Sequence, residues 1–139
     1  MAQALNPYLS FRDTARRAME FYRSVFGGEL TMNTFGEFGQ SANHPGSANL
    51  IMHSQLETPS GFTLMGADTP PDMDYKGAGN ITVSLSGDDD DAALSAYWKR
   101  LSDGASITVP LEKAPWGDSF GILTDRYGIA WMVNITAAK

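Results

Sequence analysis

Hydrophobic residues in the first half of the chain alternate between two spacings, which predicts one helix among four strands. Apolar residues at 8–11 predict a short strand, and Asp13 after it could accept hydrogen bonds from the first N–H groups of a helix. Six residues then share one face at helical spacing: Ala15, Ala18, Met19, Tyr22, Val25 and Phe26. Glycines 27 and 28 end this helix. Further strands are predicted at residues 29–35, 49–56 and 62–65.

The second half repeats this order of elements. A strand at residues 81–85 precedes an acidic run, Asp88–Asp91, which suits the N-terminus of a helix better than a calcium loop because it lacks the alternating oxygen ligands and the distal glutamate. The helix that follows carries Leu94, Tyr97, Trp98 and Leu101 and ends at Gly104. Strands are predicted at 107–111, 119–124 and 130–135. An offset of about 75 residues superposes the two patterns.

This repeat predicts an α+β fold made of two β-α-β-β-β modules, at about residues 6–66 and about 80–135. Each module has a helix on only one face of its sheet, so the other face is left open. We expect the two open faces to pair into a curved, partly closed mixed sheet around a cavity, with the helices outside. The whole chain, residues 1–139, is then a single domain, and the cavity is the expected place of function.

The composition of the chain excludes several classes of partner and of functional site. The chain has 16 acidic and 10 basic residues, a formal net charge of −6, so nucleic acid and anionic membranes are not expected partners. It has no cysteine, which excludes disulfides, thiolate metal sites and a cysteine nucleophile. The first residues lack a basic and apolar signal pattern, and no run approaches the roughly 18 apolar residues of a membrane span. A cytoplasmic location is the expectation.

Several short blocks carry a family resemblance. They include Pro7-Tyr8-Leu9-Ser10-Phe11, Val25-Phe26-Gly27-Gly28, Ile51-Met52-His53, Gly79-Asn80-Ile81-Thr82-Val83, Trp116-Gly117-Asp118-Ser119-Phe120 and Thr124-Asp125-Arg126-Tyr127-Gly128. In this order and spacing they resemble the PhnB-like branch of the vicinal oxygen chelate superfamily, the glyoxalase and bleomycin-resistance fold. The resemblance implies the paired-module fold and a homodimer. Members of this branch often carry the name of a ubiquinone-pathway methyltransferase, but no glycine-rich nucleotide fingerprint follows a strand here.

The resemblance also implies where a divalent metal would be held in the metal-dependent members. The four positions fall near Pro7 or Tyr8, near Thr63, at Asn80 and at Met132. None of these side chains is an imidazole or a carboxylate, the groups that such ions require. We therefore expect no metal and no other cofactor.

Few residues remain as candidates for chemistry. His53, in a predicted strand, could be a general base or a hydrogen-bond partner of a ligand, or simply a half-buried histidine satisfied by a cross-strand partner. Glu37, Asp68 and Glu112 are the carboxylates that could pair with it in space. Trp116 could form a pocket wall or a dimer contact, or pack in the core. In the last strand Met132 is expected to face the cavity and Trp131 the helix.

Two functions stay open. The first is a metal-free protein that binds and sequesters an unidentified small molecule, with apolar contacts from Trp116, Phe120 and Met132 and polar contacts from His53, Asn80 and Thr82. The second is an isomerase or lyase of a small oxygenated metabolite, which would use His53 or a metal at a non-standard site. A purely structural role without a closed cavity is a third reading.

Overall fold

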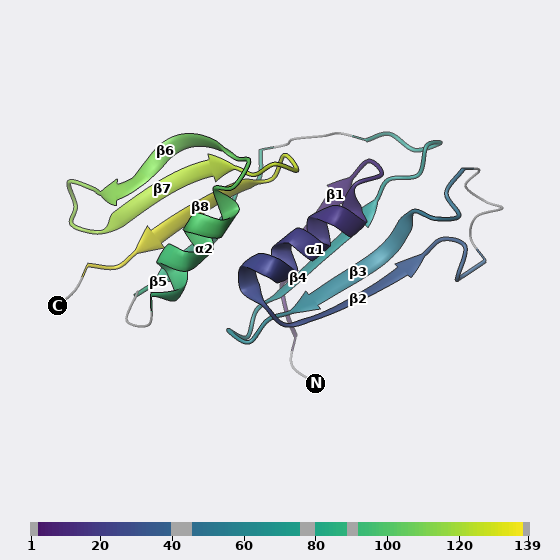
Figure 1. Cartoon of the computed structure of the whole chain (residues 1–139), viewed down its shortest axis with the longest axis horizontal. Helices are drawn as coiled ribbons and strands as arrows, with labels where there is room; N and C mark the ends of the chain where they lie inside the picture. Colours follow the sequence, from purple (N-terminus) through teal and green to yellow (C-terminus); the bar gives the residue numbers. More distant parts are fainter. Residues whose placement is uncertain (1–2, 40–45, 76–79, 89–91, 138–139) are drawn as a thin grey trace. The chain divides into compact units, whose positions relative to one another are not determined.

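The computed structural model describes residues 3–39, 46–75, 80–88 and 92–137, and it confirms the α+β class with two β-α-β-β-β modules. The chain divides into two compact units, residues 1–77 and residues 78–139. Among the described residues, each unit contains one helix and one four-stranded mixed sheet (Figure 1).

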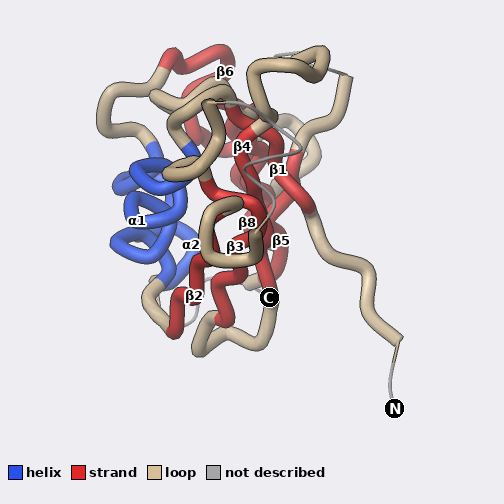
Figure 2. The backbone as a smooth tube through the Cα atoms, turned by 90° about the vertical axis from the view of Figure 1, so that its right-hand side faces the viewer, coloured by secondary structure: helices blue, strands red, loops and turns tan. Residues whose placement is uncertain are grey.

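The first unit is a sheet with its helix packed on one face. Its elements are β1 (Tyr8–Phe11), α1 (Ala15–Phe26), β2 (Glu29–Thr34), β3 (Ile51–Glu57) and β4 (Thr63–Asp68). The strand order is β1-β4-β3-β2, with β1 parallel to β4 and the other pairs antiparallel. Figure 2 shows α1 as a blue coil beside the red strands, and α1 contacts β2, β3 and β4.

The core of the first unit lies between α1 and the sheet. All six residues predicted for the apolar helix face are buried, which confirms that prediction. Alternate strand residues pack against them, among them Leu9, Phe11, Leu56 and Leu64. Gly66 lies beneath this layer, where a Cβ atom would be 3.1 Å from Met19 Sδ and 3.2 Å from Phe11 Cε2. The helix α1 therefore covers this face of the sheet and leaves the opposite face open.

The cap predicted for α1 is wrong. Asp13 takes a left-handed conformation, φ +59°, and Thr14 occupies the N-cap position without a side-chain hydrogen bond. The acceptor comes instead from the end of β4, where Asp68 Oδ1 accepts from the Ala15 N–H at 2.9 Å. Asp68 Oδ2 accepts from the Ile51 N–H, also at 2.9 Å. One buried carboxylate thus joins the helix start, β3 and β4.

The second unit repeats the arrangement. Its elements are β5 (Val83–Gly87), α2 (Ala93–Leu101), β6 (Ser106–Lys113), β7 (Ser119–Thr124) and β8 (Ala130–Ile135), in the strand order β5-β8-β7-β6. Of the predicted helix face, Leu94, Tyr97 and Leu101 are buried and Trp98 is partly exposed. Ala92 occupies the N-cap without a side-chain hydrogen bond, and Asp89–Asp91 lie outside the described residues, so their capping role stays a prediction.

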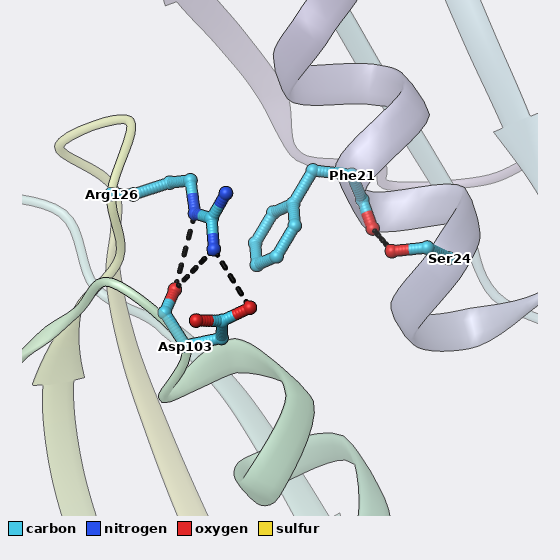
Figure 3. A network of polar contacts seen from close by, with 4 residues as sticks. All are labelled: Phe21, Ser24, Asp103 and Arg126. Atoms are coloured by element: carbon cyan, nitrogen blue, oxygen red, sulfur yellow. Dashed lines mark hydrogen bonds and ion pairs between the residues drawn. The ribbon is translucent and has the colours of Figure 1, made fainter.

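Two features fix α2 against its sheet. At Gly121 a Cβ atom would lie 2.7 Å from Trp98 Cη2 and 2.9 Å from Leu111 Cα, so the indole and the bulged β6 strand occupy the space of a side chain. Beyond the helix, the Arg126 guanidinium donates twice to the Asp103 carbonyl, at 3.0 and 3.1 Å, and lies 2.9 Å from the Asp103 carboxylate (Figure 3). The turn after α2 is thereby tied to the turn before β8.

Candidate functional site

The open face of the first sheet carries mainly uncharged polar side chains. Strand alternation places Leu9, Ser54 and Gly66 on the helix side, so their neighbours face the other way. The pairing register aligns four of these neighbours in one row, Tyr8, Met65, Gln55 and Thr31. On the same face Ser10 is opposite Ala67, and His53 is opposite Asn33. Such a face offers many hydrogen-bond donors and acceptors without a fixed charge at its centre.

His53 has its ring partner on this face. The Tyr8 hydroxyl lies 3.4 Å from His53 Nδ1, and the ring centroids are 5.9 Å apart with an interplanar angle of 33°. Burial raises the pKa of the Tyr8 phenol above its ordinary value of 10.0, so this hydroxyl stays neutral and can donate to the imidazole. Asn33 is the residue opposite His53 on β2. The structure thus brings together an imidazole, a neutral phenol and an amide.

Two of the three carboxylates considered as partners of His53, Glu37 and Asp68, have other roles. Glu37 Oε1 accepts from the Thr34 N–H at 3.1 Å, and the Glu37 N–H donates to Thr34 Oγ1 at 3.1 Å, so Glu37 closes the turn after β2. Asp68 accepts from the backbone N–H groups of Ala15 and Ile51. Neither contact involves the imidazole, and Tyr8 is the partner that sequence reasoning missed. The period-two pattern of β1, with Tyr8 and Ser10 outward, was the available signal.

The open face of the second sheet is different, because it combines apolar and acidic side chains. Its register gives one row of Glu112, Phe120, Asn134 and Ser86 and a second row of Val109, Ile122, Met132 and Ser84. Met132 is partly exposed on this face, whereas Trp131 is 1% exposed and donates its indole N–H to Asp125 Oδ2 at 2.8 Å. The opposite orientations predicted for Met132 and Trp131 are therefore found.

Trp116 and Phe120 lie together on the β6–β7 hairpin. Their rings meet edge to face, with centroids 5.9 Å apart and an interplanar angle of 64°. Trp116 is 64% exposed, in a turn that the Gly117 N–H closes on the Ala114 carbonyl. The core-packing interpretation of Trp116 is therefore wrong, because an indole this exposed has little of its surface in the core. The turn holds it out of the core, where a ligand or partner could reach it.

Thr82 lies outside the strand in which it was predicted. The strand expected at residues 81–85 begins at Val83 and ends at Gly87, so Thr82 precedes it, and Asn80 precedes it as predicted; both residues are exposed. The strand positions beside Met132 and Asn134 belong to Ser84 and Ser86. Sequence reasoning missed these two serines, although their alternation with Val83 and Leu85 was visible.

A divalent metal site of the kind that the resemblance implies does not fit these residues. At the corresponding positions, the first sheet offers the Tyr8 phenol, whose pKa is raised, and the hydroxyl of Thr63. The second offers the Asn80 amide and the Met132 thioether, with Ser84 opposite Met132. Neutral phenol, hydroxyl, amide and thioether groups are weak ligands for zinc, magnesium or iron(II). Across the described part of the chain, no three histidine, aspartate or glutamate residues are grouped to hold a metal ion.

Comparison with known proteins identifies the family. The sequence model of the Glyoxalase/Bleomycin resistance protein/Dioxygenase superfamily matches residues 4–133, which is nearly the whole chain. The chain belongs to this superfamily. Within it, the chain is 27% identical to protein YjdN of Escherichia coli over 94% of both chains, and 30% identical to an uncharacterised Mycobacterium bovis protein, Mb0911c, over 94% of this chain and 82% of that one.

Solved structures of the superfamily fold agree with the assignment. Protein PA1353 from Pseudomonas aeruginosa is 35% identical, with a TM-score of 0.81 over 99% of this chain and 100% of that one. A PhnB protein from Bacillus cereus is 23% identical, with a TM-score of 0.75 over 96% of this chain and 100% of that one, and shares the fold. The family expected from the sequence is confirmed. Among the described residues, no helix is both long and apolar enough to cross a membrane.

Proposed function

We propose that this superfamily member binds and sequesters a small molecule without a metal ion. One observation carries the proposal: the open sheet faces bear uncharged polar and apolar side chains at the positions where metal-dependent relatives are expected to hold their ligands. In the second unit Trp116, Phe120 and Met132 supply apolar contact area. Ser84, with Asn80 and Thr82 before the strand, offers hydrogen bonds, as His53 does in the first unit.

A thermal-shift series with metals tests this proposal. The chelated protein, freed of any affinity tag, is heated alone and with zinc, nickel, manganese, magnesium or iron(II). We expect an unchanged midpoint with each ion, because the phenol, thioether and hydroxyl groups bind them weakly. A metal at a hundredfold excess over its dissociation constant would add about 2.7 kcal/mol of stability, a shift of roughly 5–10 °C. A saturable shift of that size with one ion would refute the metal-free proposal.

A second function, isomerisation or elimination on a small oxygenated metabolite, is favoured by the His53–Tyr8 contact. An imidazole 3.4 Å from a neutral phenol could remove a proton from a ligand while the phenol hydrogen-bonds to its oxygen. A metal at a non-standard site belongs to the same alternative.

The homodimer and the cytoplasmic location also remain predictions from the sequence.

The substitution His53→Ala separates the two functions once a ligand is found. If the protein is a binding protein, the variant changes affinity only modestly, since one hydrogen bond of several is lost. If it is an enzyme, turnover falls at least about a hundredfold while the ligand still binds. Affinity by calorimetry and turnover by product analysis give the two readouts. Gln55→Ala, two residues along the same strand and on the same face, is the matched control and should leave turnover within a few-fold.

A further inference from the structure

Two carboxylates lie beside the aromatic pair on the open face of the second sheet. Glu112 is directly opposite Phe120 on β6, and Asn134 is directly opposite Phe120 on β8. Directly opposed residues in a sheet point to the same face. Asp118 is brought to this face because its Oδ2 accepts from Asn134 Nδ2 at 3.1 Å. Acidic groups therefore flank the Trp116–Phe120 rings.

The Asp118 carboxylate is both fixed and ionised. Its Oδ1 accepts from the Ala137 N–H at 2.9 Å, in addition to the bond from Asn134. These two hydrogen bonds hold its pKa below the ordinary value of 3.8, against a smaller opposing effect of desolvation. A carboxylate offers about four lone-pair sites, so the two bonds leave acceptor capacity toward solvent. Asp118 is thus a negative charge in a defined position near an exposed indole.

The positive charge in this part of the chain is directed elsewhere. Lys113 is the single basic residue of the described hairpin, residues 106–124. It is paired with Ser119, one position beyond the Glu112–Phe120 pair, so strand alternation places it on the other face. The neighbouring row of the open face is apolar, with Val109, Ile122 and Met132 in register. The face therefore combines acidic groups, aromatic rings and an apolar strip.

We propose that this face binds an organic cation, a protonated or quaternary amine attached to an apolar body. The ammonium group would lie against the Trp116 and Phe120 rings, with Asp118 and Glu112 as counter-charges, and the body would pack on Ile122 and Met132. Aromatic faces attract cations through their quadrupole, and a nearby carboxylate adds to this attraction. The inference rests on the proposed function, since it names the chemical class of the ligand held by the same face.

Three probes with one skeleton and different charge test the proposal: 2-phenylethylammonium, 2-phenylethanol and phenylacetate at neutral pH. Binding is followed by the shift of the Trp116 indole N–H in proton–nitrogen NMR spectra, with the signal assigned by its loss in Trp116→Phe. We expect the ammonium to bind at least about fivefold more tightly than the alcohol and phenylacetate to show no saturable shift. Raising the salt concentration should weaken the binding of the ammonium probe and leave the binding of the alcohol unchanged.

Variants locate the charge preference. Asp118→Asn and Glu112→Gln should each reduce the preference for ammonium over alcohol and leave the affinity for the alcohol unchanged. Glu20→Gln, which removes one charge from an exposed position of α1 in the first unit, should alter neither value. Equal binding of ammonium and alcohol would overturn the cation proposal and leave the small-molecule function standing. If no probe shifts the Trp116 signal, both the cation proposal and the proposed small-molecule binding are wrong for this face. The comparison of the three probes on the wild-type protein does not depend on the charge variants, so a poorly folded Asp118→Asn would not block the test.

Discussion

Gly28→Ala is expected to destabilise the first unit by about 3 kcal/mol or more, or to prevent its folding. Gly28 follows α1 with φ +106°, a conformation that L side chains rarely adopt. A Cβ atom there would lie 2.0 Å from the Glu57 carbonyl oxygen and 2.9 Å from its carbon. Both neighbours are backbone of β3, which cannot move aside as a side chain could, so strain and clash add together.

Gly61→Ala provides the matched control. Gly61 has a similar backbone conformation, φ +96°, but a Cβ atom there would meet no atom within 4 Å. Its substitution should therefore cost only the conformational strain, about 1–2 kcal/mol. The free energy of unfolding is measured by urea titration with far-ultraviolet circular dichroism. Equal costs at the two positions would show that the Glu57 contact does not constrain the chain.

The same titration reports on how the units unfold. All three tryptophans, at positions 98, 116 and 131, belong to the second unit, so tryptophan fluorescence follows that unit alone. If Gly28→Ala moves the fluorescence midpoint together with the circular dichroism midpoint, the units unfold as one. If only the circular dichroism midpoint moves, the first unit unfolds independently.

Local pattern was sufficient to predict the elements and their buried faces. The six residues predicted for the α1 face are the six that are buried, because a helix that packs on a sheet must place its apolar stripe inward. The strands β7 and β8 have the predicted bounds, and the Asp125–Gly128 turn separates the end of β7 from the start of β8. Both signals depend on residues close together in the chain.

The site was predicted less well, because it depends on register between distant strands. Thr82 was predicted within the strand at residues 81–85, but the parallel pairing with β8 starts at Val83 opposite Trp131. Where a strand begins is decided by its partner, about 50 residues away, and period-two alternation is the same for either start. The Tyr8–His53 contact has the same origin, since the two residues come from strands separated by β4 in the sheet.

The α1 cap shows this limit most clearly and leads to the second large prediction. Asp13 has the residue type and position of a local cap, yet the hydrogen bond to Ala15 comes from Asp68, 53 residues away. Asp68 is 6% exposed and accepts two backbone N–H groups from different elements. Its role in holding three elements together cannot be recognised from the residues that surround it in the sequence.

Asp68→Ala should therefore lower the free energy of unfolding by about 3–5 kcal/mol, because it leaves two buried N–H groups without an acceptor and opens a cavity. Asp13→Gly is the matched control and should be neutral or slightly stabilising, since glycine suits φ +59° and no cap bond is lost. Urea unfolding followed by circular dichroism measures both, and hydrogen exchange at Ala15 and Ile51 tests the cause. Faster exchange at both amides in Asp68→Ala, and at neither in Asp13→Gly, is the expected result. A larger loss of stability in Asp13→Gly than in Asp68→Ala would show that Asp13 caps the helix. The burial of Asp68 would then need another explanation.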